Sequence, residues 1–167
     1  VRAIAEAAVA DFVRAGGGDF VPDIAAAIPF RVMADLTAVP RSAELQIMEW
    51  GHAIAPNSDP EYRPTPTSMM DAQEALSEFL GEQFAQRREA PGDDLFSNLL
   101  RGTLDDEPLS EQDLRGYGVN YLLGGTETTR NLLGQSMRVL LEHPDQTARF
   151  VRGEVDTGTV VDELLRF

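Results

Sequence analysis

The sequence has 167 residues, of which 43% are hydrophobic and 25% are charged, as is ordinary for one soluble globular domain. Its 14 Lys and Arg stand against 28 Asp and Glu, a net charge of −14, so nucleic acids and anionic membranes are not expected as partners. The chain contains no cysteine, so it offers neither a disulfide nor a thiolate ligand for a metal. Its two histidines lie far apart in sequence, so a zinc or iron site built from imidazoles is not expected either. It contains no apolar run of about 18 residues and no signal peptide, and we therefore expect a cytoplasmic protein.

The first forty residues have helical periodicity. The pattern of residues 1–15 predicts a helix that ends at the three glycines 16–18. The next segment carries a hydrophobic residue at every fourth position, which predicts a second helix with one apolar row. Pro29 falls inside this row and should kink or split the helix. The row consists of Phe20, Ile24, Ile28, Val32 and Leu36.

The middle of the chain alternates helices with polar connections. Residues 42–55 predict an amphipathic helix, and residues 56–66, with four of the ten prolines, predict a loop that is either a lid or a plain surface connection. Residues 68–92 predict a long helix, followed by a short one at 93–100. We expect the apolar side chains of the long helix to face the core, namely Met69, Met70, Leu76, Phe79, Leu80 and Phe84.

A second long helix is predicted at about 110–143. Residues 101–109 read as a turn-rich connection with room for one small hairpin, and their acids lack the spacing of a calcium-binding loop. Ser110 is an expected N-cap with acids behind it, and Pro144 should begin the next helix. The last helix is expected from about 157. The expected fold class is therefore all-α.

The segment "NYLLGGTETTRN" is unusual for the inside of a long helix. Gly124 and Gly125 each cost roughly 1 kcal/mol relative to alanine, and together they weaken the backbone hydrogen bonds of the helix. Glu127 adds a titratable acid, and Thr128 adds a hydroxyl that can bond back to the Gly124 carbonyl or turn to a ligand. An acid and an alcohol beside a gap can deliver protons. Close packing of helices explains the small residues equally well, and both readings stay open on the residues alone.

The segment "LLGGTETT" resembles the oxygen-activating helix of the cytochrome P450 family, the haem-thiolate monooxygenases. The family pattern is small-Gly-x-acid-Thr-Thr/Ser, and "ELLR", with Glu163 and Arg166, is similar to the family's Glu-x-x-Arg. The segments "IPFRVMADLTAVP", "QRREAPGDDLFSNLL", "LSEQDL" and "LLEHPDQ" resemble bacterial members in the same order, so the resemblance covers the whole chain. The matching residues of the first motif are Gly124, Gly125, Glu127, Thr128 and Thr129.

The resemblance implies roles for the residues around the glycine pair. Gly124 and Gly125, with Tyr121 and Thr129, would line the pocket for haem and dioxygen. Thr128 would hydrogen-bond reduced dioxygen and hold water in place, while Glu127 would relay protons from solvent.

The resemblance also implies roles for residues farther from the glycine pair. Asn120 and Leu123 would face the substrate, and the loop at 56–66 would join two lid helices over the access channel. Glu163 and Arg166 would be structural, tying the following segment to the fold.

The chain departs from the family in what it lacks. The iron of the family needs a Cys thiolate, and these residues contain none. We expect a central helical fragment of one cytochrome P450 domain, residues 1–167, without the β-rich subdomain or the haem-ligand loop. This fragment should be inactive alone, should not bind haem, and should self-associate through its uncovered apolar surface.

Two functions are weighed on this basis. The first is a monooxygenase that uses haem, dioxygen, a hydrophobic small-molecule substrate and a redox partner of the ferredoxin type. The second is a haem-free relative that activates a partner glycosyltransferase, which the absence of cysteine allows. The complete acid–alcohol pair of Glu127 and Thr128 favours the monooxygenase, because a haem-free helper has no need of it.

Overall fold

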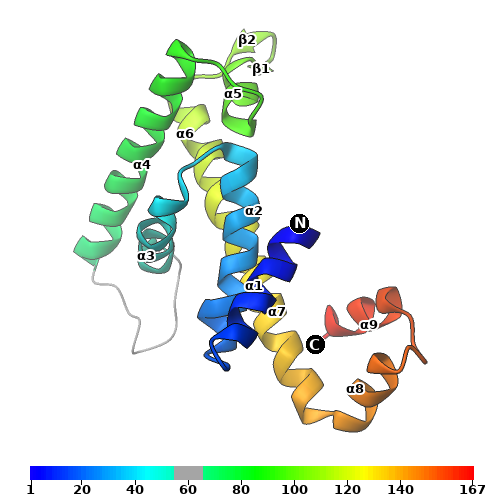
Figure 1. The fold of residues 1–167 in the computed structure, drawn as a ribbon. Helices are drawn as coiled ribbons and strands as arrows, with labels where there is room; N and C mark the ends of the chain where they lie inside the picture. Colours follow the sequence, from blue (N-terminus) through cyan, green and yellow to red (C-terminus); the bar gives the residue numbers. More distant parts are fainter. Residues whose placement is uncertain (55–65) are drawn as a thin grey trace. The chain divides into compact units, whose positions relative to one another are not determined.

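A computed structural model describes residues 1–54 and 66–167. These residues form two compact units, one made of residues 30–127 and the other of residues 1–29 together with 128–167. The described elements are helices, with one two-stranded hairpin (Figure 1), which confirms the predicted all-α class. The expected lid loop at 56–66 lies outside the described residues except for Pro66, the first residue of a helix.

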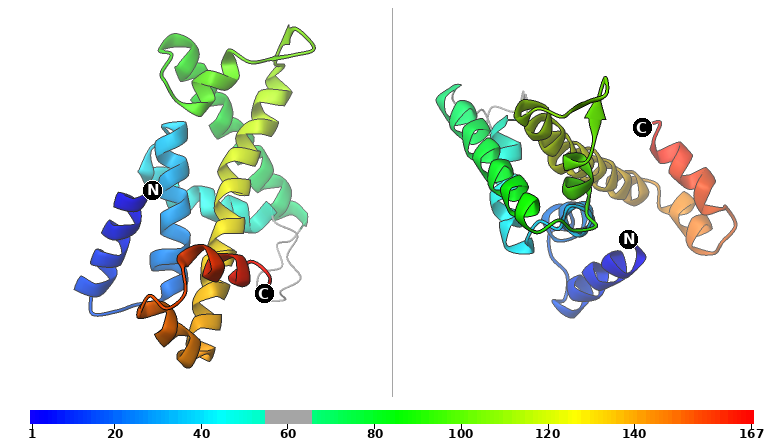
Figure 2. Two further views of the ribbon diagram at one scale, coloured as in Figure 1. Left: turned by 90° about the vertical axis from the view of Figure 1, so that its right-hand side faces the viewer. Right: turned by 90° about the horizontal axis from the view of Figure 1, so that it is seen from above.

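Helix α4, Pro66–Glu89, organises the unit of residues 30–127. Helices α3 (Glu44–Ile54), α5 (Leu95–Leu100) and α6 (Glu111–Val119) all pack against α4 (Figures 1 and 2). A single turn of 3-10 helix, η2 (Arg41–Ala43), leads into α3. The buried core of this unit consists of Phe30, Ala34, Val39, Ile47, Leu76, Leu80, Phe84, Phe96, Leu114 and Leu122.

The buried face of α4 follows from its spacing. Leu76, Leu80 and Phe84 recur every four residues and are completely buried, as expected for one helical face. Met70 is 66% exposed, so its predicted place in the core was wrong. Met70 lies six positions before Leu76, which turns it well away from the buried face of the helix. Ala72, four positions before Leu76, continues that face.

A buried ion pair ties three helices of the same unit together. Arg87 of α4 donates from Nε to the Oδ1 of Asp94 at 2.8 Å and from Nη2 to the carbonyl oxygen of Thr37 at 2.5 Å. Its guanidinium also lies 5.3 Å from the ring centre of Phe96. Arg87 thus connects α4 to the end of α2 and the start of α5, and its hydrogen-bond donors find protein partners at a buried position.

Asp94 serves the same network as the N-cap of α5. Its carboxylate accepts hydrogen bonds from the backbone N–H of Phe96 and Ser97 and from the Ser97 hydroxyl. Burial alone would raise the pKa of Asp94, but the hydrogen bonds from Ser97 and Arg87 outweigh it and hold this pKa below its ordinary value. The carboxylate is therefore the ionised partner of Arg87.

The connection between α5 and α6 is a β-hairpin with a two-residue turn. Strands β1 (Thr103–Leu104) and β2 (Glu107–Pro108) pair antiparallel, with Leu104 opposite Glu107. Asp105 and Asp106 form the turn with φ of 52° and 66°, which is the type I′ geometry that matches the twist of paired strands. The acids of this segment therefore serve a turn.

A continuous helical run extends from Glu111 to Glu142, as predicted for residues 110–143. It consists of α6, a π-helical segment η4 (Asn120–Gly124) and α7 (Gly125–Glu142). Ser110 caps its start: the hydroxyl accepts from the Asp113 N–H at 3.2 Å, and the Asp113 carboxylate accepts from the Ser110 N–H. This reciprocal arrangement is a capping box.

The other unit begins with α1 (Arg2–Arg14), which packs against the π-helical segment η1 (Val21–Ala26). Gly16 and Gly17 end α1 with φ of +83° and +109°, a conformation that only glycine adopts without strain. Val21 of η1 lies near Gly134 of α7, where a Cβ would be 3.6 Å from its Cγ2. The unit also contains α8 (Pro144–Val151) and α9 (Thr157–Leu164).

Pro29 does not split the second predicted helix. The helix continues from η1 into α2 (Ala27–Thr37), and the irregular turns come before the proline. Pro29 cannot donate to the carbonyl of Ala25, and its ring crowds that carbonyl. The wider π turn that contains Ala25 is a geometry that can relieve this crowding.

Candidate functional site

The long helix opens at the segment that the sequence singles out. In η4 the backbone follows the π-helical pattern, in which each N–H pairs with the carbonyl five residues earlier. The Thr126 hydroxyl donates to the carbonyl oxygens of Leu122 at 2.7 Å and Leu123 at 3.2 Å. A side chain thus satisfies backbone groups where the α-helical pattern changes, and the expected weakening of the helix takes the form of a π turn.

The two glycines at this opening serve different purposes. A Cβ at Gly125 would lie 2.8 Å from the Sδ of Met33 on α2, so Gly125 allows close packing. A Cβ at Gly124 would meet none of the described atoms within 4 Å, and Gly124 is exposed. Packing therefore explains Gly125, whereas Gly124 leaves the backbone accessible from outside.

Helix α3 crosses the long helix at the same place. A Cβ at Gly51 would be 2.9 Å from the Cδ2 of Leu123, so the two backbones approach closely there. Leu123 and Tyr121 are both partly buried against the core of this unit. Asn120 is exposed. Of the residues expected to face a substrate or haem, Tyr121 and Leu123 thus lie on the packed side of η4, and Asn120 lies on its open side.

Glu127 lies in the first turn of α7, beside His52 of α3. The Nε2 of His52 is 3.7 Å from the Oε1 of Glu127, and the two side chains are 39% and 24% exposed. Sequence alone does not connect His52 with Glu127, because the two lie 75 positions apart and no spacing rule relates them. Only the crossing of α3 over the long helix brings them together.

Thr128 and Thr129 follow Glu127 in the first turn of α7, and both are exposed. Asn120, Gly124 and Thr128 are thus exposed positions at intervals of four along one helical run. That interval places side chains on one face of a helix. The exposed Gly124 is therefore followed, within one helical turn, by the carboxylate of Glu127 and the hydroxyl of Thr128.

Glu163 and Arg166 lie at the end of α9. Arg166 follows the last helical turn, and its Nε is 3.4 Å from the Oε2 of Glu163. Both side chains are largely exposed, and such pairs stabilise a fold weakly.

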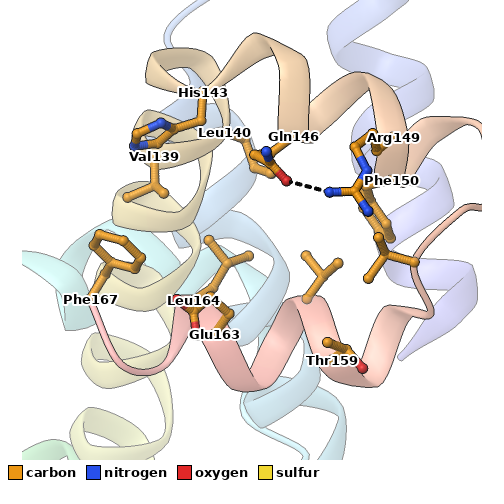
Figure 3. Close-up of a pocket in the computed structure, with 12 residues that line it drawn as sticks. Val139, Leu140, His143, Gln146, Arg149, Phe150, Thr159, Glu163, Leu164 and Phe167 are labelled. Carbon is orange, nitrogen blue, oxygen red and sulfur yellow. Dashed lines mark hydrogen bonds between the residues drawn. The ribbon is translucent and has the colours of Figure 1, made fainter.

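A pocket of about 500 Å³ lies between the end of α7, α8 and α9 (Figure 3). Its walls are mostly apolar, with Phe150 and Leu164 among them, and Glu163 and His143 line it as well. The Gln146 side chain accepts a hydrogen bond from the Arg149 guanidinium at 3.1 Å across its upper wall (Figure 3). This pocket could not be predicted from the sequence, because its lining residues come from the end of α7, from α8, from α9 and from the segments between and after them.

A haem needs a protein ligand for its iron and open space for its flat face. Among the described residues, no three His, Cys, Asp or Glu side chains lie close enough together to hold a metal ion, and the sequence contains no Cys. Gly124 is exposed, and a Cβ there would meet none of the described atoms within 4 Å, so space is open beside the helix at this position. That space is compatible with a flat group, whereas the chain contains no thiolate for the iron of a haem.

The chain is similar to known proteins both in sequence and in structure. No protein-family model matches it. The steroid C26-monooxygenase of Mycobacterium tuberculosis is 30% identical over 166 residues, which are 98% of this chain and 37% of that protein. The linalool 8-monooxygenase of Pseudomonas putida is 31% identical over 149 residues, 87% of this chain and 36% of the relative.

Solved structures agree with these relatives. A Mycobacterium marinum cytochrome P450 in complex with pseudoionone superposes with a TM-score of 0.87 at 30% identity, covering 98% of this chain and 41% of that one. The Bacillus subtilis cytochrome P450 PksS gives a TM-score of 0.84 at 27% identity, over 98% of this chain and 41% of that one. The chain belongs to the cytochrome P450 family. It spans 34% to 37% of the length of the curated relatives it matches first.

No helix in the described ranges, 1–54 and 66–167, combines the length and the apolar character needed to cross a bilayer.

Proposed function

We propose that this chain forms the dioxygen-facing part of a haem-dependent monooxygenase that hydroxylates a hydrophobic small organic molecule. The single observation that carries the proposal is the π-helical opening at Asn120–Gly124, followed directly by Glu127 and Thr128. Curated relatives named for oxidation of a steroid and of linalool support a hydrophobic substrate. When bound, haem supplies the iron at which dioxygen is activated.

The residues of the chain have separate tasks in this proposal. Gly124 leaves the backbone accessible so that haem and dioxygen can approach it. Tyr121, Thr129 and the backbone of Gly125 line the same pocket, while the Cα of Gly125 also packs against Met33. Thr128 places a hydroxyl proton beside dioxygen, and Glu127 passes protons from solvent to Thr128. The Glu127 side chain is 24% exposed, which supports its contact with solvent.

The remaining assignments belong to the same proposal. Asn120 and Leu123 contact the substrate, and the loop at 56–66 forms part of a lid over it. Glu163 and Arg166 stabilise the segment that follows them. A ferredoxin-type protein supplies the electrons, and the enzyme is cytoplasmic and bacterial. These 167 residues alone are inactive, do not bind haem and self-associate.

The test begins with the coding DNA downstream of the Phe167 codon. An in-frame Phe-x-x-Gly-x-x-x-Cys-x-Gly segment supports the monooxygenase, because it supplies the thiolate ligand. The intact protein should then give the thiolate-type difference spectrum when reduced under carbon monoxide, and should oxidise a steroid or linalool with an electron donor. A frame that continues without any Cys would instead support the second candidate, a haem-free activator of a glycosyltransferase.

A further inference from the structure

Helix α3 crosses the long helix where the acid of the proposed proton relay lies. The crossing is close because Gly51 has no side chain, and a Cβ there would be 2.9 Å from the Cδ2 of Leu123. His52 follows Gly51 on α3, and Glu127 follows Leu123 by one helical turn. The Gly51–Leu123 approach therefore determines how near the imidazole comes to the carboxylate.

The imidazole of His52 and the carboxylate of Glu127 lie near each other without a direct hydrogen bond between them. The distance between the Nε2 of His52 and the Oε1 of Glu127 is 3.7 Å, beyond the usual hydrogen-bond length. Both groups remain partly exposed to solvent, and pairs of this kind contribute little to the stability of a fold. The effect of His52 should therefore be on the orientation of Glu127.

We propose that His52 is a positioning residue for Glu127: it holds the carboxylate on the α3 side of the long helix, in place to pass protons toward Thr128. The inference rests on the proposed proton-relay function. A glutamate side chain rotates about three bonds, and a nearby imidazole restricts that rotation. The other histidine, His143, lies beside a separate pocket and serves as a control.

The first test measures the pairing without reference to activity. Diethyl pyrocarbonate acylates accessible imidazole nitrogens. The intact protein is modified and then digested, and mass spectrometry of the peptides gives separate modification rates for His52 and His143. The Glu127 carboxylate lies 3.7 Å from the Nε2 of His52 and covers one side of the ring, so Glu127→Ala, which removes that contact, should raise the rate at His52 about threefold. The rate at His143 should not change. Equal changes at both histidines would overturn the proposal.

The second test measures the consequence for proton delivery in the intact, haem-loaded enzyme. His52→Gln should raise the share of electrons that end as hydrogen peroxide, in the same direction as Glu127→Gln, while His143→Gln should leave it unchanged. Because His52 acts through Glu127, the double variant should be no worse than Glu127→Gln alone. Additive losses would overturn the proposal.

Two further variants keep the outcomes distinct. If His52→Gln folds poorly, Gly51→Ala moves α3 away from Leu123 and should also speed the modification of His52. If Glu127→Gln and Thr128→Ala both leave peroxide formation unchanged, the proton-relay function fails. The modification rates would still decide whether Glu127 holds His52.

Discussion

The thioether of Met33 lies against Gly125 so closely that a Cβ on this glycine would be 2.8 Å from the sulfur. The adjacent Gly124 meets none of the described side chains in this way. One glycine of the pair is therefore required by packing inside the chain. The other is left for a function that the chain alone does not show.

The two glycines should respond oppositely to alanine. Gly124→Ala should raise the free energy of unfolding by about 0.5–1 kcal/mol, because alanine is the better helix former. The same change should impair haem and dioxygen binding in the intact enzyme. Gly125→Ala should lower the stability by about 1–3 kcal/mol through overpacking against Met33. Denaturant unfolding and haem titration measure both effects, and a destabilised Gly124→Ala variant would contradict this account.

A second matched pair lies in α6. Gly118 is buried, with a Cβ position only 2.7 Å from the Cδ2 of Leu80, whereas the Cβ position of Gly116 meets none of the described atoms within 4 Å. Gly118→Ala should destabilise the protein by about 1–3 kcal/mol, and Gly116→Ala should stabilise it slightly. Thermal unfolding of the two variants checks the order, and equal melting temperatures would show that Leu80 simply moves aside.

The buried ion pair should be the most sensitive polar contact of its unit. Asp94→Ala leaves the Arg87 charge without its acid and removes the cap of α5, so it should cost about 3–5 kcal/mol of stability. Asp93→Ala, at the exposed neighbouring position, is the control and should change little. Urea unfolding of both variants gives the comparison, and similar midpoints would show that the pair does not hold the helices together.

The same carboxylate predicts how stability depends on pH. Because the fold lowers the pKa of Asp94, its contribution is complete above the ordinary aspartate value of about 3.9 and is lost as the pH falls through the lower folded value. The free energy of unfolding should therefore fall more steeply with acid in the wild type than in Asp94→Asn. Parallel curves from pH 6 to 2 would contradict the lowered pKa.

Thr128→Ala addresses the chemistry. In the intact enzyme this variant should still bind haem but should divert reducing equivalents from product to hydrogen peroxide, because the hydroxyl that directs protons is lost. Thr128→Ser keeps the hydroxyl and should retain most of the coupling. Product and peroxide are measured against electron-donor consumption. Unchanged coupling in Thr128→Ala would refute the role given to this residue.

Periodicity and caps were enough to predict much of the fold. The helical run from Glu111 to Glu142 could be predicted because the capping residue Ser110 precedes it and Pro144 follows it. The Arg87–Asp94 pair could not, since the Thr37 carbonyl that completes it lies 50 residues away in sequence. His52 was missed for the same reason. The sequence also could not separate Gly124 from Gly125, because the difference lies in a side chain of another helix.

The π turn at Asn120–Gly124 has a consequence for the alignment of this chain with its relatives. Such a turn is equivalent to one extra residue accommodated inside an α-helix. Removing one residue from this segment should restore a regular helix and leave the residues after it on their present faces, whereas the same deletion inside α7 would rotate everything after it by about 100°. A gap of a single residue in an alignment with the relatives therefore belongs in this segment, where it disturbs the rest of the long helix least.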